Sequence, residues 1–193
     1  MCAFTCFGQE MDEAEKQRDS LKSVVFFSFE AVQPIPLGDS FIKEGLDLKL
    51  GGELSYNVYL FDKVLVGAGY NWFKGRVINK QVTGNYDRTN VSVIFGTTGY
   101  RFFPLKNVEL LFTFGLGYVR YMNRIDDLDA YDDGTSYWLS PKVSYQFIKN
   151  FSVYTLIDFR RDKLDIQVPN ALDDFYNKIY YANVSLGINY LIY

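Results

Sequence analysis

The chain has 193 residues, of which 17 are Phe, 16 are Tyr and 2 are Trp, and it contains no His. Its net charge is −3 and its mean hydropathy is −0.09. The composition excludes a disordered chain, because so many aromatic side chains can bury enough apolar surface to drive collapse. A helical membrane protein is excluded too, since no stretch reaches the ~20 apolar residues that a spanning helix needs. Without His, His-ligated metals and His-based catalytic dyads are excluded.

Residues 1–8 are apolar or small and contain both cysteines of the chain, Cys2 and Cys6. We interpret them as the remnant of a secretory signal peptide, with small residues at Cys6 and Gly8 before the cleavage point. A frayed apolar terminus and a lipid-modified Cys6 are the alternatives. Residues 9–21 carry mixed charge and are predicted to form a polar periplasmic tail. The rest of the chain is free of cysteine, so we expect no disulfide framework in it.

From residue 22 onward the chain alternates between apolar and polar residues, which is typical of half-buried strands. Eight strands are predicted, at 22–33, 46–60, 64–78, 88–103, 108–124, 136–148, 151–165 and 179–193. Their connections alternate in length: 61–63, 104–107 and 149–150 are short, whereas 34–45, 79–87, 125–135 and 166–178 are long. We therefore predict an all-β fold for residues 22–193. It is an eight-stranded antiparallel up-and-down transmembrane β-barrel with short periplasmic turns and long extracellular loops.

The side-chain alternation distinguishes a membrane barrel from a soluble one. In residues 46–60 one face carries large apolar side chains from Leu46 to Leu60, and the other carries Glu53, Ser55 and Asn57. Residues 108–124, 136–148 and 179–193 repeat this pattern. Because the small and polar set fits a narrow lumen, we expect the bulky set to face lipid. Residues 88–103 alternate less well, since Ile94 and Phe102 fall on the predicted polar face and Arg101 falls on the apolar face.

Aromatic residues cluster near both ends of the predicted strands, as in the belts at the two membrane interfaces. The C-terminal segment from Ser185 to Tyr193 then resembles the assembly signal of bacterial outer-membrane barrels. The matching positions are Gly187, Tyr190, Ile192 and Tyr193. The whole body resembles the small OmpA/OmpX-type group of outer-membrane barrels. This resemblance implies a bacterial outer-membrane location and, as partners, the lipid bilayer and the barrel-assembly machinery. We also expect a monomer, and a surface partner that the long loops could bind.

Five charged residues are predicted to share the lumen, namely Glu30, Glu53, Lys142, Asp158 and Arg160. Across the turn at 149–150, Lys142 and Asp158 should lie directly opposite or one diagonal apart. Isolated charges in so narrow an interior are costly, so our hypothesis is a structural ion network in which Lys142 pairs with Asp158. A gate for small ions is the functional alternative.

The remaining candidate sites are weak. The acidic residues within 126–133 offer oxygen ligands for a divalent cation, but their spacing does not match an EF-hand. We interpret these acidic residues as a solvated loop and expect no metal and no cofactor. We expect no catalytic residue either, because nothing pairs Asp173 and Asp174 with a nucleophile. Nucleic acid is not expected as a partner, because its binding requires a basic face and the chain has a net charge of −3.

The sequence thus predicts an integral outer-membrane barrel with a narrow polar lumen and a structural or surface-interaction role, and not an enzyme. One alternative is a small channel or transport protein for ions or small solutes. The other is a soluble, lipocalin-like ligand-binding barrel, which would have an apolar interior.

Overall fold

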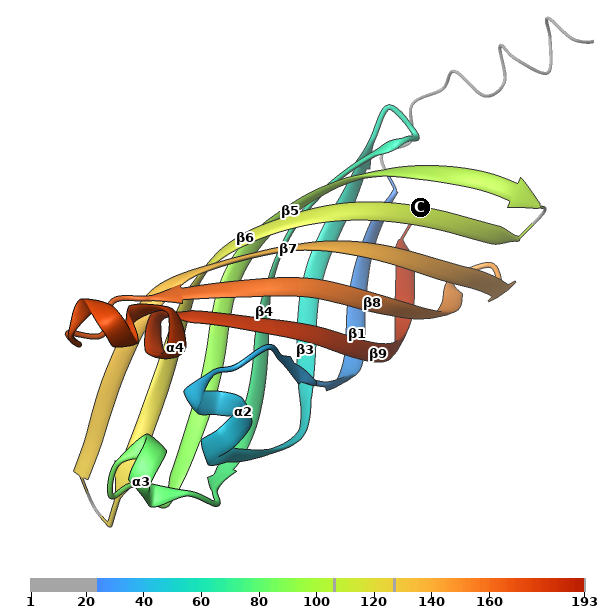
Figure 1. Cartoon of the computed structure of the whole chain (residues 1–193). Helices are drawn as coiled ribbons and strands as arrows, with labels where there is room; N and C mark the ends of the chain where they lie inside the picture. Colours follow the sequence, from blue (N-terminus) through green and yellow to red (C-terminus); the bar gives the residue numbers. More distant parts are fainter. Residues whose placement is uncertain (1–23, 106, 127, 193) are drawn as a thin grey trace, which may run out of the picture.

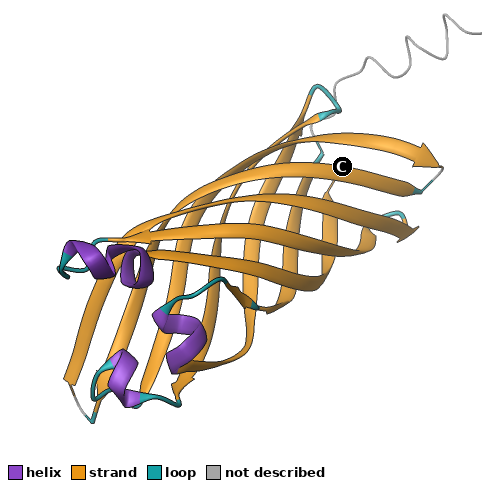
Figure 2. Cartoon of the chain, viewed as in Figure 1, coloured by secondary structure: helices purple, strands orange, loops and turns teal. Residues whose placement is uncertain are grey.

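The computed structural model describes residues 24–105, 107–126 and 128–192, and it is dominated by a single sheet (Figures 1 and 2). The long strands are β1 (Val25–Gln33), β3 (Leu46–Leu60), β4 (Val64–Val77), β5 (Arg88–Leu105), β6 (Val108–Ile125), β7 (Leu128–Ile148), β8 (Phe151–Leu164) and β9 (Lys178–Ile192). The segments interpreted as a signal-peptide remnant, 1–8, and as a polar tail, 9–21, lie outside the described residues.

The eight long strands form a closed antiparallel barrel. Each pairs with its neighbour along the chain, and β1 also pairs with β9, from Val25 opposite Ile192 to Gln33 opposite Val184. The predicted eight-stranded antiparallel up-and-down barrel is therefore confirmed. Closure leaves no long strand with a free edge, which is the condition that a sheet in a hydrocarbon environment must meet.

The short elements gather at one end of the barrel, away from the tight turns (Figures 1 and 2). They are β2 (Pro36–Leu37), α2 (Phe41–Gly45), α3 (Lys80–Thr83), η1 (Asn170–Leu172) and α4 (Asp173–Asn177). We call this the loop end, and we call the other the turn end. At the turn end, Phe61 and Asp62 both have positive φ, which lets the β3–β4 turn follow the twist of its strands. Within the described part of the chain, no helix is long and apolar enough to span a bilayer.

One predicted long loop is wrong. Residues 128–135 belong to strand β7, because β6 and β7 stay paired up to Ile125 opposite Leu128. The reason is a set of complementary cross-strand pairs that the acidic composition concealed. Arg124 binds Asp129 through two hydrogen bonds of 2.6 and 3.0 Å, and Arg120 binds Asp133 through two of 2.7 and 3.1 Å.

The outward face of the barrel is apolar over most of its height. On β6, β7 and β9 the residues predicted to face outward do so, and many remain about half exposed. Examples are Phe112, Phe114, Leu116, Leu139, Val143, Leu186 and Ile188. The alternate residues on these strands point inward, and most are small or polar.

Two predicted face assignments are wrong. In β3 the register shifts between Lys49 and Gly52, and this irregularity turns Leu46 and Leu48 inward. In β5 the apolar residues Val91, Val93 and Phe95 fill the lumen, while Ile94 and Phe102 point outward. The misfit of Arg101 is thereby explained, since the odd-numbered face of β5 is the inner one.

Candidate functional site

Whether a barrel is an open pore or a closed one depends on what fills its lumen. In this barrel, an apolar cluster fills the loop-end half of the lumen. The cluster combines residues from the strand walls with residues from α2. Its buried members are Phe41, Ile42, Leu46, Phe73, Val91, Val93, Phe95, Val119, Tyr121, Trp138, Leu164, Ile179 and Tyr181.

The helices at the loop end hold this cluster closed. Ser40 caps α2 by accepting a hydrogen bond from the Lys43 amide at 3.4 Å, and α2 then presents Phe41 and Ile42 to the lumen. The Phe41 ring stacks on Tyr176 of α4 with centroids 5.5 Å apart. The Tyr176 hydroxyl donates to the carbonyl of Val82 in α3 at 3.0 Å. The three helices thus form a connected lid over the barrel mouth.

Glycines in the strand walls make room for the large rings inside. A Cβ at Gly115 would lie 2.2 Å from Cε2 of Trp138, and a Cβ at Gly69 would lie 2.5 Å from Cζ of Phe95. Trp138 and Phe95 pack edge to face with centroids 5.0 Å apart. These glycines therefore serve close packing across the lumen, as glycines inside strands often do.

Among the aromatic side chains of the apolar cluster lies a buried ionic layer. Arg160 donates to both carboxylate oxygens of Asp162, with Nε at 2.7 Å from Oδ1 and Nη2 at 2.6 Å from Oδ2. The Tyr121 hydroxyl donates to the same carboxylate at 2.7 Å and lies 2.8 Å from the Tyr181 hydroxyl. Both charged side chains are almost completely buried. Such a pair is tolerated because its remaining lone pairs and protons are satisfied.

The ionic layer continues toward the centre of the barrel through Asn71. Arg160 donates to the Asn71 side-chain oxygen at 3.3 Å, and the Asn71 amide donates to Glu53 at 3.2 Å. Glu53 then lines a central cavity of about 50 Å³ together with Glu30, Lys142 and Asp158. The predicted lumen residues are thus gathered in one region, with Arg160 in the adjacent layer.

Asp158 lies one diagonal from Lys142, as predicted, but the predicted contact between the two charges takes a different form. Asp158 lies opposite Ser140 and accepts a hydrogen bond from the Ser140 hydroxyl. Lys142 Nζ lies 3.4 Å from the Asn189 side-chain oxygen and 3.4 Å from the centre of the Tyr154 ring. Among the residues that the structure describes, no carboxylate lies within 4.0 Å of Lys142, so the direct ion pair is wrong. In the β7–β8 register, one pair of opposed residues separates the level of Lys142 from the level of Asp158.

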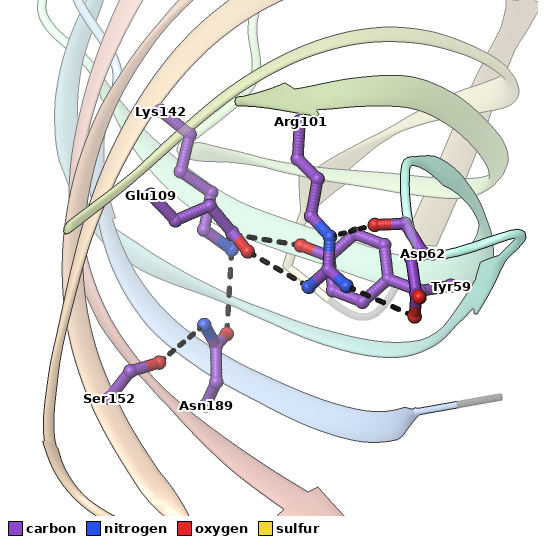
Figure 3. A network of polar contacts seen from close by, with 7 residues as sticks. All are labelled: Tyr59, Asp62, Arg101, Glu109, Lys142, Ser152 and Asn189. Carbon is purple, nitrogen blue, oxygen red and sulfur yellow. Dashed lines mark hydrogen bonds and ion pairs between the residues drawn. The ribbon is translucent and has the colours of Figure 1, made fainter. Parts of the chain in front are cut away.

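At the turn end the lumen widens into a cavity of about 240 Å³ that Arg101, Glu109 and Tyr59 line (Figure 3). Arg101 Nη1 donates to Glu109 at 3.2 Å, and the guanidinium lies 3.6 Å from the centre of the Tyr59 ring. The Tyr59 hydroxyl donates to the other oxygen of Glu109 at 2.8 Å. Arg101 also binds the carbonyl of Asp62 in the β3–β4 turn. This cluster ties the turn to the inner wall.

Several solved structures share this architecture. The crystal structure of Neisserial surface protein A is similar with a TM-score of 0.63 and 13% identity, covering 87% of this chain and 96% of that one. Ail, the attachment invasion locus protein of Yersinia pestis, in complex with the heparin analogue sucrose octasulfate, gives a TM-score of 0.53 and 16% identity. That match covers 88% of this chain and 97% of Ail.

A major outer membrane protein from Thermus thermophilus also gives a TM-score of 0.53, with 14% identity over 87% of this chain and 99% of that one. The fold is that of the small outer-membrane β-barrels. No family model matches the chain, and no curated protein matches it in sequence.

The candidate assembly signal of this barrel lies on the strand that closes it. Tyr190 and Ile192 point outward from β9 and are about half exposed, whereas Gly187 faces the lumen. A Cβ at Gly187 would lie 2.4 Å from Cζ of Tyr154, so the glycine makes room for that ring. Tyr193 lies outside the described residues.

Three acidic residues of β7 are paired with side chains of β6, and Asp127 lies outside the described residues. Asp132 accepts from Asn123 at 2.7 Å, and Asp129 and Asp133 bind arginines as described above. Among the described residues, no group of three or more Asp or Glu side chains has the arrangement of a metal site. Inside the lumen, the charged and polar side chains neutralise and hydrogen-bond one another.

Several lumen residues escaped the sequence prediction. Asp162, Tyr121 and Tyr181 complete the ionic layer, and Tyr59 and Glu109 complete the turn-end cluster. A signal for the first group was present, because Asp162 lies two residues from Arg160 and therefore on the same face of the strand. The second group was marked by Arg101, the one charge that did not fit the predicted faces.

Proposed function

We propose that the protein is an integral barrel of the bacterial outer membrane, with the turn end in the periplasm and the loop end outside the cell. The observation that carries this proposal is the ring of large apolar side chains on the outward face of a closed barrel. Soluble proteins rarely expose so large a continuous apolar surface, whereas a bilayer core solvates it. The same observation disfavours a lipocalin-like barrel, whose outer face would be polar.

We further propose a structural or surface-interaction role rather than transport or catalysis. The support is the lumen, which the apolar cluster, the ionic layer and the lid of α2, α3 and α4 fill from the loop end to the centre. A barrel filled in this way offers a rigid surface at the loop end for a partner. Ail, a structural neighbour, is described as an attachment invasion locus protein. At 16% identity, the likeness between Ail and this chain is a likeness of fold.

Two measurements test the proposal. Refolded into detergent or lipid vesicles, the protein should migrate differently on a gel before and after boiling, because a closed membrane barrel resists the detergent of the gel until it is heated. In planar bilayers the inserted barrel should show no steady conductance. Equal mobility in both samples would contradict a membrane barrel, and steady ion currents would favour the small-channel alternative.

Gly187, Tyr190, Ile192 and Tyr193 are proposed as the signal that the barrel-assembly machinery reads, and the barrel is proposed to act as a monomer. Tyr190→Ala should reduce the amount of folded protein in the outer membrane of cells while leaving refolding in vitro intact. The matched control is Tyr145→Ala, at an outward position of similar exposure on β7. Equal loss for both variants would indicate a general folding defect instead.

A further inference from the structure

Three arginines lie side by side on the outer wall near the loop end. Arg76 of β4 pairs in register with Arg88 of β5, and Arg88 pairs in register with Arg124 of β6. Like charges directly opposite each other destabilise a sheet. Acidic residues neutralise only the two ends of this row: Asp47 lies 3.4 Å from Arg76, and Asp129 lies 2.6 Å from Arg124.

The middle of the row has no such partner. Within the described part of the chain, no carboxylate lies within 4.0 Å of the Arg88 guanidinium, and Asp87 beside it is held by Lys80 at 2.9 Å. Lys74, two residues from Arg76 on the same face, likewise has no carboxylate within 4.0 Å among the described residues. Lys74 and Arg88 therefore point outward from adjacent strands with no carboxylate of the described residues at ion-pair distance, and Asp129 acts on Arg88 only from further away.

The wall here is hollowed into a groove with a volume of about 690 Å³, which Lys74 and the Asp133-bound Arg120 line. Arg88 does not line the groove itself, but it lies two residues from Asn90, which does, on the same face of β5. Lys74 and Asn90 line its upper part and face each other across β4 and β5. Further from the loop end, the groove is lined by Leu54, Tyr70 and Trp72, and the rings of Tyr70 and Trp72 stack with centroids 5.7 Å apart.

The charge on this side of the barrel is opposite to that of the whole chain. The outward strand residues of β3–β7 near the loop end include six cations and three carboxylates, whereas the chain has a net charge of −3. They are Lys49, Lys74, Arg76, Arg88, Arg120 and Arg124 against Asp47, Asp129 and Asp133. A cationic rim above an aromatic and apolar floor matches an amphiphile with an anionic head.

We propose that this groove binds a phosphorylated lipid of the leaflet that surrounds the loop end. Lys74 and Arg88 hold the phosphate, and the acyl chain lies along Leu54, Tyr70 and Trp72. The inference rests on the proposed membrane location. It assigns the lipid by its chemistry, because cations such as these bind phosphate oxygens through charge-assisted hydrogen bonds. Neutralising Arg88 also relieves the repulsion within the row of arginines.

The groove can be probed through its own tryptophan. The chain has two tryptophans, and Trp138 lies inside the lumen, so Trp138→Phe leaves Trp72 as a fluorescent reporter of the groove. In this background the folded barrel is placed in phosphatidylcholine vesicles that contain a minor amount of phosphatidic acid. Brominated acyl chains are carried either by the phosphatidic acid or by an equal amount of phosphatidylcholine. We expect Trp72 to be quenched preferentially by brominated phosphatidic acid.

Lys74→Gln combined with Arg88→Gln should reduce this preference about tenfold, the effect of losing one charge-assisted hydrogen bond or more. The matched control is Arg161→Gln with Lys163→Gln, which removes two outward cations from β8 and should change the preference less than about twofold. Inorganic phosphate in the buffer should not compete, since it lacks the acyl chain. Equal quenching by both brominated lipids, an equal loss in the control, or displacement by inorganic phosphate would each overturn the proposal.

A second measurement guards against a misfolded variant. Phosphatidic acid should raise the urea midpoint for unfolding of the parent barrel and should have no such effect on the Lys74→Gln and Arg88→Gln variant. In pure phosphatidylcholine that variant should be at least as stable as the parent, because it lacks the repulsion between arginines. A barrel that inserts and shifts its gel mobility but shows no lipid preference would contradict this inference alone. Failure to insert would contradict the proposed function.

Discussion

Arg160 and Asp162 lie two residues apart on β8 and form a bidentate ion pair inside the barrel, with N–O distances of 2.7 and 2.6 Å. Both side chains point into the lumen because alternate residues of a strand share a face. The pair therefore depends on the local strand conformation as well as on closure of the barrel around it.

Replacing one member of this pair should be far more harmful than replacing both. Asp162→Asn leaves a buried guanidinium without its counter-ion and should lower the free energy of unfolding by about 3–5 kcal/mol. The double change with Arg160→Met should recover most of this loss. Equilibrium unfolding in urea of the refolded barrel measures both values. Simple addition of the two single losses would show that the residues act independently.

Lys142 should act as the shared counter-ion of the central cavity. It lines that cavity with Glu30, Glu53 and Asp158, and one carboxylate oxygen of Glu30 has no hydrogen-bond partner among the described residues. Lys142→Met should therefore destabilise the barrel by about 3–5 kcal/mol. Adding Glu30→Gln should restore part of the stability, since it removes a negative charge that has lost its counter-ion. A double-mutant cycle measures this coupling, and a coupling free energy near zero would contradict a shared role.

Gly115 should tolerate no larger residue while Trp138 is present. A Cβ at this position would lie 2.2 Å from the indole ring, so Gly115→Ala should cost about 1–3 kcal/mol through overpacking. Trp138→Phe should partly relieve this cost, and Gly96→Ala is a suitable control because the nearest atom to its Cβ would be 3.9 Å away. Urea unfolding followed by far-ultraviolet circular dichroism gives the comparison. Similar losses at Gly96 and Gly115 would argue against the steric explanation.

Asp87 gives the loop end a defined response to acid. The hydrogen bond from Lys80, together with the charge of its ammonium group, holds the pKa of this carboxyl below its ordinary value of 3.8. Because the folded pKa is the lower one, the stabilisation is fully present above pH 3.8 and disappears as the pH falls through the folded pKa. Carbon-13 chemical shifts of the Asp87 carboxyl should report this low value. In Lys80→Met the midpoint should return toward 3.8, and an unchanged midpoint would exclude Lys80 as the cause.

The sequence predicted the barrel because its strands obey a period of two wherever lipid contacts one face. On β6, β7 and β9 the outward residues need only be apolar and the inward ones only small or polar, so the pattern is simple. It failed in β5, where Val91, Val93 and Phe95 are apolar residues that face inward. Their partners in the lumen are Phe41 and Ile42 of α2, and a single sequence does not reveal that a connecting segment enters the barrel.

The candidate site was predictable in part for the same reason. The parity of Glu30, Glu53, Lys142, Asp158 and Arg160 along their strands placed them inside, and the structure brings them into one region. Their individual partners depended on register. The β7–β8 alignment sets Asp158 opposite Ser140 and not Lys142. A shift of one pair changes every such contact, and turn sequences define it only approximately.

The unequal lengths of the strand pairings imply an order of events in folding. β6 and β7 pair continuously from Val108 to Ile125, which lies opposite Leu128, so their contacts are close in sequence and form with little loss of loop entropy. The contact between Ser28 and Asn189 spans 161 residues and exists only when β1 meets β9. Since α2 follows β1 in the chain, we expect its apolar residues to reach the lumen at the last stage, when that seam forms.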